Sequence, residues 1–216
     1  MSLFDPWRDW FRQILPKLNR RHKESPLQDI LNKALIGSVK TTGALDLKGI
    51  TLHYSADRDV PRTVASLIKA GLGYHYLIGR NGMIYPLAED THALAHAGTA
   101  SWHGYSPNRH HVAICVMSWG KLTIKNGTLA TWTGAPLPPE EVRTLGDGSQ
   151  WDKATIEQEA SLLRLLYHYT TERGVDPDHL CGHSECCFPK GRKSDPGGVL
   201  ALPLPKIREM LSARNC

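Results

Sequence analysis

Three side chains that could hold and use a metal ion lie close together near the end of the chain. His183 follows Gly182, and Lys193 and Asp195 come a short distance later. Neutral imidazole and carboxylate are both good ligands for Zn²⁺, and the charge of Lys193 can face the same point. The segment is rich in proline and glycine, which argues against a regular helix. We therefore expect a loop that folds His183 and Asp195 back onto one point.

A third ligand must come from elsewhere in the chain, and the best candidate is His53. It stands near the end of the run 49–55, which reads as a buried strand. Strand ends and the loops after them are where chemistry is usually mounted. The predicted zinc ligands are therefore His53, His183 and Asp195.

The cysteines around His183 allow a second interpretation, in which they form a zinc knot with that histidine. The candidates are Cys181, Cys186 and Cys187. Adjacent cysteines rarely bind one ion together, and this interpretation leaves the later lysine and aspartate without a role. The chain has five cysteines in all, and the odd count favours reduced thiols.

Composition describes a basic, globular chain. Its 216 residues are enough for one domain with a core and an appendage, and 41% of them are hydrophobic. The net charge is +5 and the pI about 9.0, so an anionic partner is favoured: wall polymer, nucleic acid or anionic lipid. Apart from residues 17–23 no basic run resembles a nucleic-acid-binding arm, and we expect no nucleic-acid partner.

Two features bear on compartment. The sequence contains no run of 18 apolar residues, the length that a membrane span needs. Charged residues interrupt residues 1–18, so we recognise no signal peptide. We expect a protein that is made in the cytoplasm and reaches any wall substrate only after release or delivery.

Residues 1–48 are predicted to form an N-terminal helical extension. Apolar residues in the first 24 positions recur at steps of three and four, the period of an amphipathic helix, and residues 26–35 read as a second short helix. Tryptophans beside arginines also suit a membrane-surface helix. We favour a helix that docks on the following domain.

Residues 49–216 alternate predicted strands and helices, which is typical of a single α/β domain. Strands are expected at 50–55, 74–78, 83–87 and 112–117 and after residue 180, and helices at 60–70, 154–173 and 205–214. Asn81-Gly82 predicts a hairpin turn, and Thr155 with Gln158 a capping box. Residues 119–150 read as an irregular insertion, either a wall of a substrate groove or a surface excursion with short strands.

At four places the chain resembles the zinc-dependent N-acetylmuramoyl-L-alanine amidases, which include phage lysozymes, peptidoglycan recognition proteins and cytosolic recycling amidases. The matching blocks are His53 after its strand, residues 73–85, residues 96–108 and residues 182–197. They occur in the family's order and span roughly residues 49–212. The resemblance implies a mixed central β-sheet flanked by helices, with zinc in a groove at one edge.

The resemblance also implies roles for individual residues. Lys193 matches a lysine that stabilises the oxyanion, and Tyr74 matches a tyrosine that serves as proton donor or orients the water. His96, Trp102 and Asn108 match positions that line the substrate site. Recycling amidases carry a glutamate where this chain has Cys115, so the chain is more similar to the phage and recognition-protein branch.

Three functions remain open on these grounds. The first is a wall-degrading amidase, a phage or prophage endolysin or an antibacterial enzyme, that cleaves the bond between N-acetylmuramic acid and L-alanine. The second is a cytosolic amidase that recycles anhydromuropeptides. The third is a non-catalytic peptidoglycan-binding module, which would have no need of three metal ligands.

Overall fold

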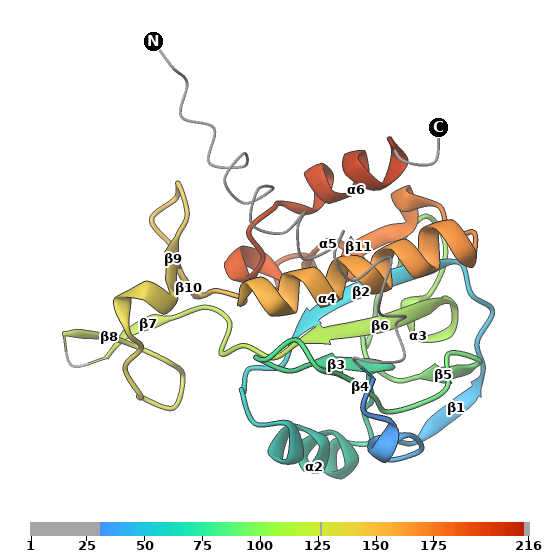
Figure 1. Ribbon diagram of the computed structural model, residues 1–216, viewed down its shortest axis with the longest axis horizontal. Coiled ribbons are helices and arrows are strands. Elements are labelled where there is room, and N and C mark those ends of the chain that lie inside the picture. Colours follow the sequence, from blue (N-terminus) through green and yellow to red (C-terminus); the bar gives the residue numbers. More distant parts are fainter. Residues whose placement is uncertain (1–30, 126, 214–216) are drawn as a thin grey trace.

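The computed structural model describes residues 31–125 and 127–213, and its centre is a five-stranded sheet (Figure 1). The strand order is β11-β2-β6-β3-β4. Neighbours run parallel from β11 to β3, and β4 is antiparallel to β3, so the predicted mixed sheet is confirmed. The strands are β2 (Gly49–Tyr54), β3 (Tyr76–Ile78), β4 (Ile84–Pro86), β6 (His111–Val116) and β11 (Leu180–Gly182).

The two longest strands, β2 and β6, lie side by side in the interior of the sheet. Every residue of β6 and all but the last of β2 are buried. Parallel strands covered on both faces read as continuous apolar runs, which is why both were predictable from sequence. The pairing sets His53 of β2 opposite Cys115 of β6.

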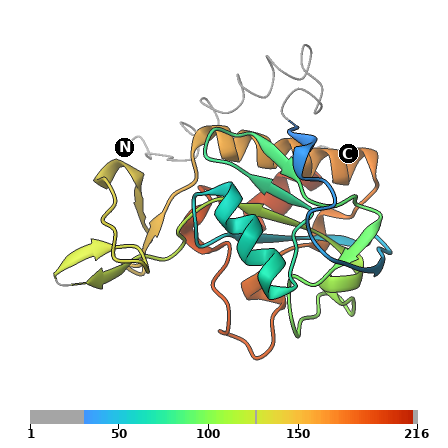
Figure 2. The ribbon, with the colours of Figure 1, turned by 90° about the horizontal axis from the view of Figure 1, so that it is seen from below.

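Helices cover both faces of the sheet (Figures 1 and 2). On one face α4 (Ile156–Tyr167) and α6 (Leu204–Ser212) pack over Ile50 and Leu52. On the other face α2 (Val60–Ala70) packs near Cys115. Because side chains alternate along a strand, His53 points to the α2 side, away from Ile50 and Leu52.

Helix boundaries follow local chemistry. Thr155 and Gln158 form the predicted capping box at the start of α4, which ends in a π-helical turn, His168–Glu172. The predicted loop after Gly182 is wrong in part: His183–Cys186 form a short helix, α5. Glu185 reaches back and accepts a hydrogen bond from the Gly182 N–H at 2.8 Å, which stabilises this single turn.

Short elements also occur outside the predicted strands and helices. The exposed strand β1 (Thr41–Ala44) pairs with β5 (His92–Leu94), and α3 (Pro107–His110) precedes β6. Short 3-10 segments lie at Lys33–Leu35, Pro177–His179 and Gly197–Val199. Within residues 31–48 the predicted extension therefore forms one 3-10 turn and a strand, while its N-terminal helix lies outside the described residues.

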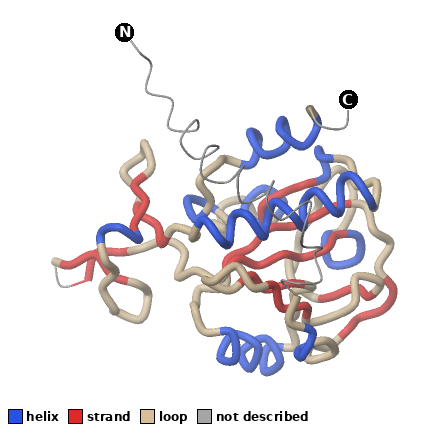
Figure 3. Tube along the Cα trace, viewed as in Figure 1, coloured by secondary structure: helices blue, strands red, loops and turns tan. Residues whose placement is uncertain are grey.

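Residues 121–152 form an arm that projects beyond one end of the sheet (left in Figure 1; Figure 3). Two small hairpins make up most of it: β7 (Thr123–Lys125) with β8 (Thr128–Ala130), and β9 (Val142–Thr144) with β10 (Gln150–Asp152), with a 3-10 turn at Pro139–Glu141. Arg58 anchors the arm: its Nε lies 2.9 Å from Asp152 Oδ2 and its Nη1 2.6 Å from Glu141 Oε2. The arrowheads of β2 and β6 point toward this arm.

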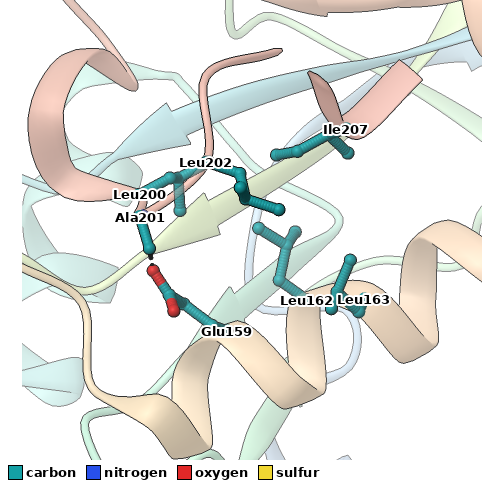
Figure 4. A pocket seen from close by; sticks show the side chains of 7 residues that line it. All are labelled: Glu159, Leu162, Leu163, Leu200, Ala201, Leu202 and Ile207. Atoms are coloured by element: carbon teal, nitrogen blue, oxygen red, sulfur yellow. Dashed lines mark hydrogen bonds between the residues drawn. The ribbon is translucent and has the colours of Figure 1, made fainter. Parts of the chain in front are cut away.

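An apolar pocket lies between α4 and α6 (Figure 4). Leu162 and Leu163 of α4, Ile207 of α6 and residues 200–202 line it, and the one carboxylate there, Glu159, accepts a hydrogen bond from Ala201 N at 2.6 Å. This pocket is on the face of the sheet away from His53, and its lining offers no reactive group. Among the described residues no helix is long and apolar enough to cross a membrane.

Candidate metal centre

The structure brings His53, His183 and Asp195 together at the carboxyl ends of β2 and β11. Asp195 Oδ2 lies 2.9 Å from His53 Nδ1 and 3.1 Å from His183 Nδ1. All three candidate ligand atoms lie within 4.8 Å of one another, and all three residues are buried. The carboxyl ends of parallel strands are the common place for ligand sites in α/β sheets.

Backbone contacts hold Asp195 in this position. The N–H of Ser184, in the first turn of α5, donates to the Asp195 carbonyl oxygen at 2.9 Å. The neighbouring Ser194 hydroxyl lies 2.8 Å from the hydroxyl of Tyr54, at the end of β2. The loop that carries the carboxylate is thus tied both to the helix that carries His183 and to the strand that carries His53.

The other ring nitrogen of His183 determines its tautomer. His183 Nε2 lies 2.9 Å from the carbonyl oxygen of Ala97. A carbonyl oxygen only accepts, so Nε2 carries the hydrogen and Nδ1 is left with a lone pair directed at Asp195.

His53 is set in the same way, through a second histidine. His96 Nε2 lies 3.0 Å from the carbonyl oxygen of Pro107 and donates to it, which leaves His96 Nδ1 as an acceptor. That atom lies 3.1 Å from His53 Nε2, so His53 donates there and presents its Nδ1 lone pair to Asp195. Burial lowers the pKa of His96 well below its usual value, and the neighbouring His53 adds to the effect, so the His96 ring is neutral.

Asn108 stabilises the backbone segment that contains His96, which orients His53, and Ala97, which orients His183. Its Oδ1 accepts from the backbone N–H groups of His96 at 3.0 Å and Ala97 at 2.8 Å, and its Nδ2 donates to the Gly98 carbonyl at 2.9 Å. One asparagine therefore holds the backbone of the residue that orients His53 and of the residue that orients His183.

Three lone-pair atoms converging on one point fit a divalent cation. Metal-bound histidines commonly donate their second ring N–H to a carbonyl or a similar acceptor, as both do here. The separations of 2.9 and 3.1 Å are close to the roughly 3.3 Å between ligand atoms in a tetrahedral zinc site with 2.0–2.1 Å bonds. Burial would raise the pKa of Asp195, but its close contacts with His183 and His53 outweigh this and hold the pKa well below its usual range, so the carboxylate is charged.

The two predicted catalytic side chains lie beside this cluster. The ring of Tyr74 is 4.8 Å from that of His53, and burial raises the pKa of its hydroxyl well above 10. Burial lowers the pKa of His53, and the positive charge of Lys193, which stands two residues before Asp195 in the chain, adds to the lowering. Within the described residues neither the Tyr74 hydroxyl nor the Lys193 ammonium group has a hydrogen-bond partner, so both are available to a ligand.

Comparison with known proteins agrees with this geometry. A family model for N-acetylmuramoyl-L-alanine amidases matches residues 43–198, which include every residue of the cluster. The chain belongs to the N-acetylmuramoyl-L-alanine amidase family. A comparison with curated protein sequences found no match for this chain.

Solved structures show the same fold at low sequence identity. The amidase AmiD from E. coli, solved with anhydro-N-acetylmuramic acid-L-Ala-D-gamma-Glu-L-Lys, matches with a TM-score of 0.57 and 19% identity over 80% of this chain. AMPDH3 from Pseudomonas aeruginosa, solved with anhydromuramic pentapeptide, has a TM-score of 0.54 and 21% identity over 81% of it. This chain spans only 60% and 63% of those two chains. The endolysin LysCS from Clostridium intestinale has a TM-score of 0.51 and 17% identity, with 84% of this chain and 97% of that chain covered.

The three residues predicted to line the substrate site lie at two places in the structure. His96 and Asn108 stand behind the ligands, with the contacts described above using all the polar atoms of their side chains. Trp102 lies toward the start of β11: its indole N–H donates to the Asp178 carbonyl at 2.9 Å, and Arg208 lies over its ring. None of the three directs a free polar atom to the cluster.

The described cysteines do not form the alternative zinc site. Among the described residues, three potential ligand atoms meet within 4.8 Å only at His53, His183 and Asp195. Cys181 Sγ faces Thr51 Oγ1 at 3.6 Å, and Cys187 Sγ lies 3.7 Å from the carbonyl oxygens of Ser184 and Pro189. Cys115 is fully buried, and burial raises its pKa well above 9, so it is a thiol and no nucleophile.

Proposed function

We propose that this protein hydrolyses the amide bond between N-acetylmuramic acid and the L-alanine of the peptidoglycan stem peptide, with zinc as its cofactor. One observation carries the proposal: both histidine tautomers are fixed so that two nitrogen lone pairs and one carboxylate oxygen meet at one buried point. A protein that only binds the wall needs no such arrangement. Membership of the amidase family supports the reaction class.

The residues of the site divide the chemical work. Zinc held by His53, His183 and Asp195 would supply an activated water and polarise the scissile carbonyl. Lys193 places a positive charge where an oxyanion develops. Tyr74 keeps its proton because its pKa is raised, so its hydroxyl can donate a hydrogen bond or a proton to the leaving nitrogen.

The substrate class follows from the same reasoning. AmiD and AMPDH3 were solved with anhydromuramyl peptides, and LysCS is an endolysin, so proteins of both kinds share this fold. By the resemblance described above, Cys115 occupies the position at which recycling amidases carry a glutamate. We therefore propose intact peptidoglycan as the substrate, met after release or delivery of the protein, as expected of an endolysin or an antibacterial enzyme.

Mass spectrometry of purified peptidoglycan tests this function. The protein is incubated with intact sacculi, with zinc and with chelator, in parallel with a soluble anhydromuropeptide. Zinc-dependent release of stem peptides that start at L-alanine, from unbroken glycan strands, is the expected result, and His53→Ala should abolish it. Activity on the soluble fragment alone would favour a recycling amidase, and zinc binding without release from either would leave a binding module.

A further inference from the structure

Two tryptophans of the arm region form an exposed pair. The rings of Trp119 and Trp132 lie 6.5 Å apart between centroids at an angle of 64°. Trp132 is 59% exposed, and Trp119 is half-buried. Large aromatic side chains are rarely left this open in water, and grouped exposed apolar side chains commonly mark a binding site.

The domain holds the ring of Trp132 and the backbone of Trp119 in place. Trp132 Nε1 donates to the carbonyl oxygen of Ala56 at 2.7 Å. The backbone N–H of Trp119 donates to Asp152 Oδ2 at 2.7 Å, and that carboxylate is also bound by Arg58. The Trp132 ring is therefore pre-ordered, and little freedom of that side chain is lost when a ligand binds.

The pair lies at the metal end of the sheet. Ala56, which anchors Trp132, is three residues beyond His53 in the chain. Three residues span at most about 11 Å even when fully extended. A polymer whose scissile bond sits at the metal cluster can therefore reach these rings, whereas a fragment with a single sugar has no second sugar to place against them.

The chemistry of the pair suits a sugar. A pyranose ring has an apolar C–H face and a rim of hydroxyl groups, and the tryptophan ring is amphipathic in the same way. The N–H of Trp132 is already used by Ala56, which leaves its ring face for stacking. Trp119 Nε1 has no partner in the described part of the chain, so it can donate to a hydroxyl or an acetamide oxygen.

We propose that Trp119 and Trp132 form a glycan subsite, which holds an N-acetylated sugar of the wall strand a short distance from the bond that is cut. The inference rests on the proposed function, since it assigns the arm to the polymer part of that substrate. It also predicts the substrate class: long glycan strands are preferred over single-sugar muropeptides.

The test compares two substrates with the same stem peptide, one carried on a glycan strand of several disaccharides and one on a single muramyl sugar. The measured quantity is the ratio of kcat/KM for the strand to kcat/KM for the fragment. Trp132→Ala should lower this ratio by roughly five- to tenfold, the size expected for loss of one aromatic stacking contact. The loss should appear in KM for the strand rather than in kcat, and Trp132→Phe, which retains a flat ring, should recover most of it.

A matched control and a binding measurement complete the test. Ile124 lies on the same arm and is 66% exposed, so Ile124→Ala removes exposed apolar surface without touching the pair and should keep the ratio. Oligomers of N-acetylglucosamine should quench the tryptophan fluorescence of the wild type and not of Trp132→Ala. An unchanged ratio together with unchanged quenching would overturn the subsite, whereas a wild type that releases no peptide from either substrate would overturn the proposed function.

Discussion

His96 Nδ1 lies 3.1 Å from His53 Nε2, on the side of the imidazole away from Asp195. This contact fixes which nitrogen of His53 carries the hydrogen, and the Pro107 carbonyl fixes His96 in turn. The metal-facing lone pair of His53 is therefore set by a backbone group two steps away. We propose that His96 is a positioning residue for the metal ligand His53.

Replacing His96 should weaken metal binding. Without the ring, His53 can rotate or adopt the other tautomer, and loss of such an outer partner typically costs about 10–100-fold in metal affinity. We expect His96→Ala to show that loss in a competition titration of zinc against a chelator, with the Asn108→Ala variant affected in the same direction. His92→Ala, which removes an exposed histidine from β5, is the control and should bind zinc like the wild type. Equal zinc affinity in His96→Ala and the wild type would contradict the positioning role.

Removing the hydroxyl of Tyr74 should slow the chemical step without disturbing the metal. A positioned proton donor contributes about 10²–10⁴-fold to rate. Tyr74→Phe should therefore lower kcat by at least a hundredfold while zinc content, measured by atomic absorption, remains at one equivalent per chain. A loss of zinc in this variant would show that the ring supports His53 instead.

Lys193 offers a separate prediction for the oxyanion. A donor to the developing negative charge contributes about 10²–10³-fold to kcat. Lys193→Met keeps most of the aliphatic stem and should lose that factor, whereas Lys190→Met, an exposed lysine on the same loop, should keep wild-type kcat. Comparable activity of the two variants would remove Lys193 from the mechanism.

Much of the fold was predictable because its signals are local. The buried runs of β2 and β6, the Asn81-Gly82 turn and the Thr155 capping box each follow from a few neighbouring residues, and the structure has each of them. The strand β1 was missed because its four residues are exposed and lack apolar alternation. Its partner β5 lies far along the chain, and pairing over that distance leaves no local pattern.

The site, too, has features that the sequence predicts and features that it does not. The types and order of His53, His183 and Asp195 suffice to nominate three ligands, and the structure brings them together. The orienting contacts could not be predicted, because two of the acceptors are backbone carbonyls, of Ala97 and Pro107, and every residue has one. The resemblance drew attention to His96 and Asn108. Only the structure shows that His96 contacts the ligand His53 and that Asn108 binds the backbone of residues 96–98.

His75 should make folding sensitive to mild acid. Its Nδ1 accepts from Ala113 N at 2.9 Å and its Nε2 donates to the His92 carbonyl at 2.8 Å, so the folded ring is neutral. Burial lowers its pKa from 6.5 to about 4. The unfolded chain takes up a proton below pH 6.5 and the folded chain does not, so stability is lost as the pH falls from about 6.5 toward 4.

The size of this effect can be measured with a variant. A pKa difference of this size corresponds to about 3 kcal/mol between neutral pH and pH 4. His75→Gln should be less stable than the wild type at pH 7, and urea unfolding with chelator present should show the gap narrowing by about that amount as the pH is lowered. A gap that stays constant with pH would mean that His75 is protonated in the folded protein.

The last prediction concerns the anchor of the arm. Asp152 is fully buried, and Arg58 binds both its carboxylate and that of Glu141. Arg58→Ala leaves the buried carboxylate with Arg80 as a more distant partner, 3.6 Å away, and should lower the free energy of unfolding by about 3 kcal/mol. Arg62 forms an exposed ion pair with Asp57, so Arg62→Ala should cost about 1 kcal/mol or less. Because Asp152 also holds Trp119, Arg58→Ala should weaken binding of N-acetylglucosamine oligomers as well, and intact binding with reduced stability would separate the anchor from the glycan subsite.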